Sequence, residues 1–376
     1  MAEKTLKRID WLLVFFILPI IAAGLVTMKS FTSLENTGEF FNRQLIWIFV
    51  SFSVFFIFSF IDFRFLKRTN VLVFLFVLTS LILLSLFVLG NISHGSRSWF
   101  NFGWFSFQPA DVMKLVLVLI LAKYFSRRHV EIRYIKHIFV SGFYALIPLV
   151  LVLLQPDFGS AMIIFLIWFG MVLVSGISKT HLLLVFLAGI GIFISLWFFI
   201  FAPYQKARII NFINPVADIQ GTGYNAFQST IAVGSGQVMG KGLGFGTQSR
   251  LKFLPQPQSD FIFAAYAEEW GLIGSVLILL LYSLVIWRIL YSATLGATNF
   301  EILYALGIAI FFMSHILVNI GMNLGLMPVT GIPLPFMSYG GSHLLTEFAG
   351  LGILMSMRRY ERVAHKDEMK NEFLGA

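Results

Sequence analysis

Long apolar runs separated by short polar stretches divide most of this 376-residue chain. A helix needs about 20 apolar residues to cross the hydrocarbon core of a membrane. Ten segments meet this requirement: 9–29, 44–62, 70–90, 109–125, 136–154, 158–176, 181–201, 261–290, 301–322 and 339–357. The pattern predicts an all-α integral membrane protein with about ten transmembrane helices, organised as one polytopic domain over residues 1–376.

One long polar segment, residues 202–259, separates the seventh and eighth apolar runs. Loops of this length inside a compact protein are usually functional or disordered. The glycines, aromatic and basic residues of this one favour a functional loop. The run after it is longer than a span requires, so we expect a bend at Gly271 or Gly274.

Composition agrees with a membrane environment. Hydrophobic residues make up 58% of the chain and charged residues 12%, whereas soluble chains carry about 25% charged residues. A soluble core of this length does not hide so much apolar surface. Cysteine is absent, which excludes disulfides and thiolate metal sites.

The basic residues orient the helices. Ten spans place both termini on one side, and that side holds about two-thirds of the 27 Lys and Arg residues. Because Lys and Arg gather in cytoplasmic loops, we expect both termini in the cytoplasm and the 202–259 loop outside. This distribution also accounts for the net charge of +9 without a nucleic-acid partner.

The segments that resemble functional motifs all fall on the predicted outer side. They are 97–108, 155–159, 202–259 and 331–342. The cytoplasmic loops are short, basic and otherwise featureless, so any chemistry is expected to face outward.

Three ionisable residues stand near the outer ends of the fourth and sixth spans. Asp111 and Lys114 lie three residues apart on one helix face, and ionisable groups within spans are costly enough to be functional candidates. They form either an internal ion pair that docks the helix or a site where Lys114 meets an anionic substrate. Asp157 lies in a tight turn, where it either caps the next helix or contributes to a site.

Asp260 opens the eighth span directly after the long loop and is the strongest catalytic candidate. A carboxylate at a helix start is often an N-cap, but this one adjoins a loop rich in cations and could act as a general base. Glu268 and Glu269 lie deeper on the same helix. They either support the site or have a structural role.

Histidines and glycines give weaker signals. His315, Asn319 and Asn323 form an i, i+4, i+8 stripe that helix–helix hydrogen bonding explains. His343 and Glu347 share an i, i+4 spacing, which alone does not make a metal site.

The glycine-rich stretch 240–246 matches neither a Walker A loop nor a dinucleotide fingerprint. It forms either a flexible loop or a weak diphosphate nest.

Several long motifs in one order resemble the SEDS family, whose members act in bacterial shape, elongation, division and sporulation. The motifs are Gly95-Ser96-Arg97-Ser98-Trp99, Phe107-Gln108-Pro109-Ala110-Asp111 with Lys114, Gln155-Pro156-Asp157-Phe158-Gly159, Pro203-Tyr204-Gln205 with Arg208, Ile231-Ala232-Val233-Gly234-Ser235-Gly236, Asp260-Phe261-Ile262-Phe263-Ala264 with Glu268-Glu269, and Gly331-Ile332-Pro333-Leu334-Pro335-Phe336 followed by Ser338-Tyr339-Gly340-Gly341-Ser342.

The resemblance implies a peptidoglycan glycosyltransferase that polymerises lipid II, with Asp260 as the catalytic residue. It implies a multi-pass protein of the bacterial cytoplasmic membrane, lipid II and undecaprenyl-diphosphate-linked glycan as ligands, and a class B penicillin-binding protein as the partner transpeptidase. Expected substrate-binding residues are Arg97, Lys114, Asp157, Arg208, Lys241 and Ser338, supported by Asp111, Glu268 and Glu269. The metal is unknown; a divalent cation, Mg or Mn, is the candidate cofactor.

The stretch Gly240–Gly242 followed by Gly246–Ser249 is similar to the rod-shape, RodA-like branch rather than the division, FtsW-like branch. Two departures from the family pattern stand out: Asp111 replaces a usual Glu, and residues 256–259 lack an acid and a His that usually precede the catalytic Asp. A metal or proton-relay role at those positions is therefore in doubt.

Two other function classes remain open. A lipid II flippase would use buried ionisable groups such as Glu268, Glu269 and His315. Transporters, however, place their sites near the membrane midplane and usually contain internal repeats, and this chain has no visible repeat. A scaffold without chemistry would have no need of Asp260.

Overall fold

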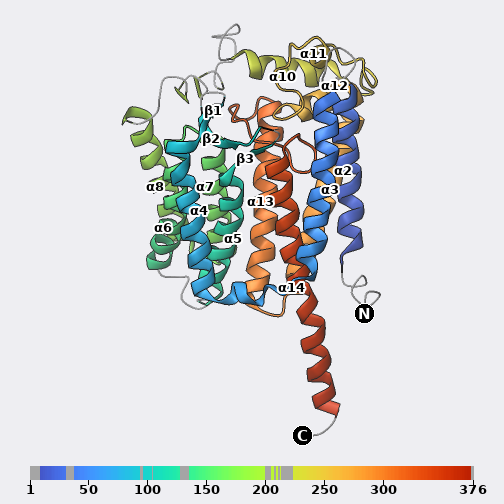
Figure 1. Ribbon diagram of the computed structural model, residues 1–376. Helices are drawn as coiled ribbons and strands as arrows, with labels where there is room; N and C mark the ends of the chain where they lie inside the picture. Colours follow the sequence, from blue (N-terminus) through green and yellow to red (C-terminus); the bar gives the residue numbers. More distant parts are fainter. Residues whose placement is uncertain are drawn as a thin grey trace.

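The computed structural model describes residues 9–30, 38–93, 96–103, 105–127, 135–199, 205–206, 209–210, 212 and 223–373. It is a bundle of long helices with shorter elements gathered at one end (Figure 1). We call that end, which carries the strands and two short helices, the outer end. The opposite end, where the first described helix begins and the last helix projects, is the inner end.

Each of the ten predicted spans coincides with a helix, which confirms the all-α membrane fold. The helices are α2 (Trp11–Ser30), α3 (Gly38–Phe60), α4 (Thr69–Leu89), α5 (Pro109–Ser126), α6 (Ile135–Leu154), α7 (Phe158–Val174), α8 (Lys179–Phe199), α12 (Ile262–Thr294), α13 (Asn299–Asn323) and α14 (Gly341–Phe373). Six of those described are long and apolar enough to cross a membrane by length and composition: α2, α3, α4, α6, α12 and α13.

Helix α13 lies at the centre of the bundle. It packs against α5, α7, α12 and α14, and 78% of its most apolar window is buried, against 22–44% in the other five long apolar helices. Large apolar side chains on the peripheral helices point outward instead; they include Phe15, Phe49, Phe74, Phe139, Phe186 and Phe198. An apolar exterior of this kind suits a hydrocarbon solvent.

Helix α14 extends beyond its predicted end at residue 357. It continues to Phe373, and the extra turns project from the inner end of the bundle (Figure 1). The prediction followed the apolar run, but a helix continues into a polar sequence when no proline or glycine interrupts it. The inner end also carries the short 3-10 helix η2 (Phe63–Lys67).

The outer end contains a small antiparallel sheet that the helix-based sequence reading missed. Its strands β1 (Asn91–Ser93), β2 (Ser96–Asn101) and β3 (Ser106–Phe107) are adjacent in the order β1-β2-β3. They occupy the aromatic segment between α4 and α5. Strands of two to six residues are too short for a clear period-2 pattern, which explains the omission.

The long polar segment contributes α10 (Tyr224–Ser235) and α11 (Thr247–Arg250) at the outer end (Figure 1). The expected bend in α12 is confirmed at Gly271, which adopts φ 66° and ψ −162°. The segment after α10 supplies hydrogen-bond acceptors for amides at the bend. The amides of Leu272 and Ile273 donate to the carbonyls of Gln237 and Val238 at 2.8 and 3.2 Å.

At the inner end, Asp10 joins three helices. It lies just before α2 and accepts hydrogen bonds from Arg288 of α12 at 2.8 and 3.0 Å and from Arg358 of α14 at 2.6 Å. Burial would raise the pKa of the Asp10 carboxyl, but the two guanidinium groups outweigh burial and hold that pKa below its ordinary value. This Asp10–Arg288–Arg358 contact fixes how α2, α12 and α14 meet.

Candidate functional site

Asp260 is held at the outer end by its backbone. Its carbonyl accepts hydrogen bonds from the side-chain amides of Asn319 and Asn323 on α13, at 3.0 and 3.1 Å. Asn323 also accepts from the amide of Ala264, at 3.1 Å. The polar stripe on α13 therefore fixes the start of α12, as the helix–helix interpretation of the stripe predicted.

Asp260 lies just before the N-cap position of α12. The N-cap position is Phe261, which makes no side-chain capping bond, and the Asp260 residue is half-buried. Its carboxylate lies beside Gly331, where a Cβ would approach Oδ2 to 3.3 Å. Gly331 has φ +73°, a conformation that glycine adopts without strain, so the backbone passes close to the carboxylate.

Ser338 ties the segment 331–338 to the loop before Asp260. Its hydroxyl donates to the carbonyl of Ser259 at 2.6 Å and accepts from the amide of Leu334 at 2.8 Å. The amide of Tyr339 donates to the carbonyl of Gln258 at 2.8 Å. Ser338 is buried, so in this arrangement it positions the Asp260 loop. The predicted contact of Ser338 with substrate stays a prediction.

Asp157 caps α7, as one of its two interpretations predicted. Its Oδ1 accepts from the amide of Ser160 at 2.9 Å. Its Oδ2 accepts from the side-chain amide of Gln108 at 2.8 Å, which links the start of α7 to the start of α5. The backbone of Gly159 packs against the segment that leads to Gly331, since a Cβ there would lie 2.6 Å from the carbonyl oxygen of Thr330.

Asp111 and Lys114 form a fully buried ion pair. Their side chains are both 1% exposed, and Lys114 Nζ lies 3.0 Å from Asp111 Oδ1. Ser342 of α14 donates to Asp111 Oδ2 at 3.3 Å. The docking interpretation is thus realised in this structure. Lys114 contacts a ligand only if this pairing changes.

Two histidines and a glutamate surround this pair. His343 Nδ1 lies 3.6 Å from Asp111 Oδ1, and His343 Nε2 lies 2.8 Å from Glu347 Oε1. The ring of His315 lies against that of His343, with centroids 4.6 Å apart. All of these side chains are buried. A polar cluster therefore lies within the bundle, between α5, α13 and α14.

Glu268 organises the segment between α10 and α12. Its carboxylate is fully buried and accepts hydrogen bonds from Ser235, Lys241, Thr247, Gln248 and Ser249, the shortest from Lys241 Nζ at 2.8 Å. Lys241 is therefore paired with Glu268 in this structure. Its predicted role at a diphosphate stays a prediction.

Glu269 and the glycine stretch complete this connection. Glu269 Oε1 accepts from the amide of Gly244 at 3.1 Å, and its carbonyl accepts from the amide of Gly242 at 3.0 Å. Gly240 has φ +81°, and a Cβ there would lie 2.1 Å from the Glu269 carbonyl oxygen. The glycines let the chain run against the bend in α12, a structural role that neither sequence interpretation included.

The structure describes one of the two predicted arginine ligands. Arg97 lies on β2, is exposed, and approaches the carbonyl of Phe87 at the end of α4 to 3.4 Å. Arg208 lies outside the described residues. Within the described part of the chain, no group of three or more His, Asp or Glu residues could hold a metal ion, so we derive no chemical step through a metal.

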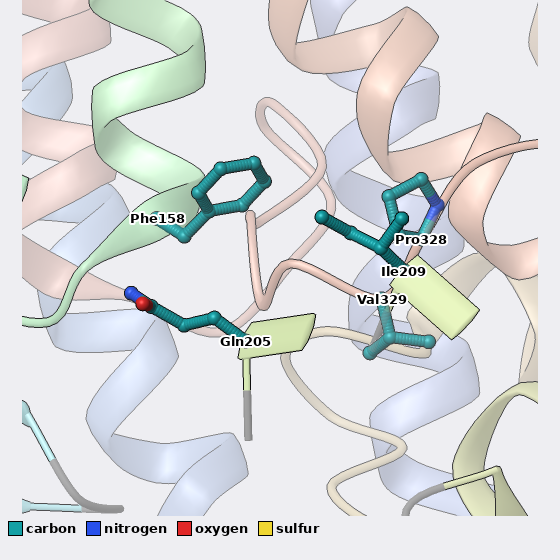
Figure 2. A pocket seen from close by; sticks show the side chains of 5 residues that line it. All are labelled: Phe158, Gln205, Ile209, Pro328 and Val329. Carbon is teal, nitrogen blue, oxygen red and sulfur yellow. The ribbon is translucent and has the colours of Figure 1, made fainter. Parts of the chain in front are cut away.

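A small apolar pocket opens near the Asp260 segment (Figure 2). It is lined by Phe158 at the start of α7, by Pro328 and Val329 before Gly331, and by Gln205 and Ile209 from the chain after α8. Figure 2 shows apolar side chains from separate parts of the chain meeting there. Val329 also packs against the outer cluster that contains Phe261.

The structure brings the predicted residues into two groups. The start of α12, the segment 331–338 and the starts of α5 and α7 form one connected outer site containing Asp260, Ser338, Asp157 and Asp111 with Lys114. Glu268, Glu269 and Lys241 belong to the bend in α12 instead. Sequence reasoning missed Gln108, which bonds Asp157; only its place beside Pro109 in a family-like motif signalled it.

Comparisons with known proteins agree with this arrangement. The family model described as cell cycle protein, covering FtsW, RodA and SpoVE, matches residues 5–363. Stage V sporulation protein E of Bacillus subtilis is 36% identical over 363 residues, covering 94% of this chain and 98% of the relative. Peptidoglycan glycosyltransferase MrdB of Escherichia coli K12 is 38% identical over 294 residues, covering 78% and 79% of the two chains.

Solved structures show the same likeness. A chain from a peptidoglycan synthase complex, described as coordinating polymerization and crosslinking, aligns with TM-score 0.79 and 30% identity over 94% of this chain and 98% of its own. The rod shape determining protein RodA of Thermus thermophilus aligns with TM-score 0.69 and 29% identity over 94% and 97%. The match across nearly the whole sequence shows that the chain belongs to the FtsW, RodA and SpoVE family of cell cycle proteins, the SEDS family.

Proposed function

We propose that this protein is a peptidoglycan glycosyltransferase that joins lipid II units into glycan strands on the outer face of the bacterial cytoplasmic membrane. An Escherichia coli relative with this enzymatic name shares 38% identity, and the fold matches RodA of Thermus thermophilus. The apolar exterior supports a multi-pass membrane location. The basic residues near the inner end support a cytoplasmic position for both termini.

Asp260 is the proposed general base. A glycan chain grows when a sugar hydroxyl attacks the anomeric carbon of the donor, and that hydroxyl must lose its proton. The observation that carries the assignment is how Asp260 is held. Asn319 and Asn323 fix its backbone carbonyl, and its carboxylate lies beside Gly331 in a half-buried residue at the outer end.

The leaving group is a polyprenyl diphosphate, whose developing charge needs nearby cations. Arg97, exposed on β2, and Arg208 are the proposed direct ligands. Lys114 is buried and paired with Asp111, so it reaches the diphosphate only if that pairing changes. Lys241 is paired with Glu268 but its side chain is 27% exposed, so its ammonium can donate to a diphosphate as well. A divalent ion, Mg or Mn, is the proposed alternative source of positive charge.

The proposal also names a partner protein and the branch of the family to which this chain belongs. A class B penicillin-binding protein is the proposed partner transpeptidase, supported by the likeness to a chain of a peptidoglycan synthase complex. Elongation of the rod is the proposed process, supported by the likeness to RodA of Thermus thermophilus and by the glycine stretch 240–246. Relatives named FtsW, at 32–36% identity, keep the division branch as the alternative.

The test is a polymerisation assay with purified wild-type protein, its partner transpeptidase and lipid II. Asp260→Asn should fold and bind lipid II but lose about 10²–10⁴-fold in rate, the usual contribution of general-base catalysis. Asp62→Asn is the matched control, because Asp62 caps η2 at the inner end and an asparagine there can still cap.

Two results would contradict the proposal. Polymer at the wild-type rate from Asp260→Asn would remove the general-base role. Wild-type protein that moves lipid II across vesicles without making polymer would instead establish the flippase reading.

A further inference from the structure

Five ionisable side chains form a buried group between α5, α13 and α14, which we call the buried charge cluster. Its members are Asp111, Lys114, His315, His343 and Glu347. Each is at most 5% exposed as a residue. None of the roles proposed above uses His315, His343 or Glu347, although ionisable groups in such surroundings are costly to bury.

The charges of this cluster do not balance without a bound proton. Asp111 and Glu347 each bring one negative charge when ionised, and Lys114 brings one positive charge. Lys114 is committed to Asp111, with Nζ 3.0 Å from Oδ1. Among the described residues, the hydrogen bond that Glu347 accepts comes from the backbone amide of Phe336, to Oε2 at 3.1 Å. An uncompensated carboxylate this deeply buried would strongly destabilise the fold.

His343 is placed to carry the missing charge. Its Nε2 lies 2.8 Å from Glu347 Oε1, and its Nδ1 lies 3.6 Å from Asp111 Oδ1. Neither nitrogen meets hydrogen-bond geometry with its carboxylate among the described residues, so the contact is one between charges. An imidazolium at these distances is attracted to both carboxylates, whereas a neutral ring carries no charge to offset them.

His315 is the poorer candidate for the charge. Its Nδ1 lies 3.4 Å from the carbonyl oxygen of Pro333, a contact that a neutral ring can make, and its Nε2 has no hydrogen-bond partner among the described residues. Two imidazolium rings 4.6 Å apart would repel each other. The two carboxylates therefore draw the proton to His343.

We infer that His343 is a buried imidazolium that balances Asp111 and Glu347 and thereby acts as a positioning residue for the outer site. The charges then alternate from Lys114 through Asp111 and His343 to Glu347, which joins α5 to α14. Only the effect on polymerisation rests on the proposed function; the charge state does not.

The connection to the site runs through residues next to the cluster. Ser342, beside His343, donates to Asp111 Oδ2 at 3.3 Å and accepts from the amide of Gln108 at 3.2 Å. Gln108 in turn bonds Asp157 at 2.8 Å. Immediately before this point, the chain passes through Ser338, which holds the Asp260 loop. Loss of the charge on His343 would therefore loosen the contact between the α5 and α14 parts of the site.

Groups from the other packed helices are consistent with this charge state. From α12, Tyr282 donates its hydroxyl to the carbonyl of Pro335 at 2.6 Å. From α3, the neutral amide of Gln44 donates to the carbonyl of Ser338 at 3.2 Å. Neither contributes a positive charge, so among these neighbours His343 remains the one that can neutralise Glu347.

The experiment is a double-mutant cycle on the full chain in detergent, with His343→Gln, Glu347→Gln and the two together. Thermal unfolding is measured at pH 8 and at pH 6. His343→Gln leaves Glu347 uncompensated and should show the largest loss of stability at pH 8. The double variant keeps only the neutral Asp111–Lys114 pair, so it should recover most of that loss. Coupling between contacting charged groups typically corresponds to about a 2- to 150-fold change in the unfolding equilibrium.

The pH comparison separates charge from packing. Lowering the pH lets Glu347 take up a proton, which should restore part of the stability of His343→Gln relative to wild type. His315→Gln is the matched control: it removes a neutral ring, so its effect should be the same at pH 8 and pH 6. A purely structural role of His343 predicts equal losses at both pH values.

The outcomes are distinct even if a variant does not fold. A double variant as unstable as His343→Gln, or worse, would overturn the inference. If His343→Gln cannot be purified at pH 8, a purifiable double variant supports the inference and a double variant that also fails overturns it. Polymerisation by the double variant should likewise exceed that of His343→Gln. Absence of polymer from wild-type protein counts against the proposed function alone, because the stability cycle still reports the charge state.

Discussion

Asp10 and Asp260 each stand just before a transmembrane helix, at opposite ends of the bundle, yet the structure holds them in opposite ways. Asp10 uses its carboxylate: both oxygens face Arg288 and Arg358 across three helices. Asp260 uses its backbone carbonyl, which Asn319 and Asn323 bind, while its carboxylate lies half-buried beside Gly331.

This difference separates a structural carboxylate from a catalytic candidate. A carboxylate enclosed by two guanidinium groups is stabilised as an anion and makes a poor proton acceptor. A residue fixed through its backbone carbonyl does not depend on its carboxylate for its position. The sequence alone does not distinguish Asp10 from Asp260, because each aspartate precedes an apolar run and is therefore a candidate helix cap.

The largest expected contrast comes from removing each carboxylate. Asp10→Ala leaves two arginines without their anion and should lower the free energy of unfolding by roughly 3–5 kcal/mol, as is typical when one partner of a buried ion pair is removed. Asp260→Ala should change stability far less while abolishing polymer formation. Denaturation and polymerisation assays on both variants measure this; similar stability losses would erase the distinction.

Glu268 and Glu269 provide a second contrast on adjacent positions. Glu268→Gln should lose about 1–3 kcal/mol of stability, because a neutral amide cannot replace the contacts that Glu268 makes with Lys241 and the 247–249 amides and hydroxyls. Glu269→Gln is the matched control and should cost less, since Glu269 Oε2 has no hydrogen-bond partner among the described residues. Limited proteolysis of the outer segment would reveal the same order; the reverse order would show that Glu268 does not anchor it.

The pH dependence of the inner contact should be a smaller effect. Because the folded-state pKa of Asp10 is lowered, the stabilisation is present above the unfolded-state value of about 4. It is lost as the pH falls through the lower folded-state value. Unfolding of wild type and Asp10→Asn should therefore converge in acid and differ by a constant amount between pH 6 and 8. A gap that persists in acid would show that the contact is not ionic.

The smallest expected effect concerns Asp157. Asp157→Asn should change the free energy of unfolding by no more than about 0.5 kcal/mol, because aspartate and asparagine cap helices about equally well. Asp157→Ala removes the cap and should cost about 1 kcal/mol. Loss of polymerisation in Asp157→Asn without loss of stability would instead move Asp157 from the scaffold into the catalytic site.

The helices could be predicted from the sequence because each span depends on a local property. An apolar run of about 20 residues partitions into hydrocarbon whatever its neighbours are, so all ten spans appeared, as did the bend at Gly271. The β1–β3 sheet could not be predicted in this way, since its strands are too short to carry a period. The same limit applied to the end of α14, where a polar sequence continues the helix outside the apolar run.

The sequence by itself determined the membrane fold, the family and the residues that concentrate at the outer end. Only the tertiary structure decided what those residues touch. Lys114 and Lys241 look alike as basic candidates, but burial beside Asp111 and Glu268 pairs both of them. Asp157 and Asp260 look alike as helix caps; Asp157 caps α7 through Ser160, whereas Asn319 and Asn323 fix Asp260 through its backbone carbonyl. The physical reason is that ion pairs and hydrogen bonds join positions up to hundreds of residues apart, and their geometry exists only after the helices pack.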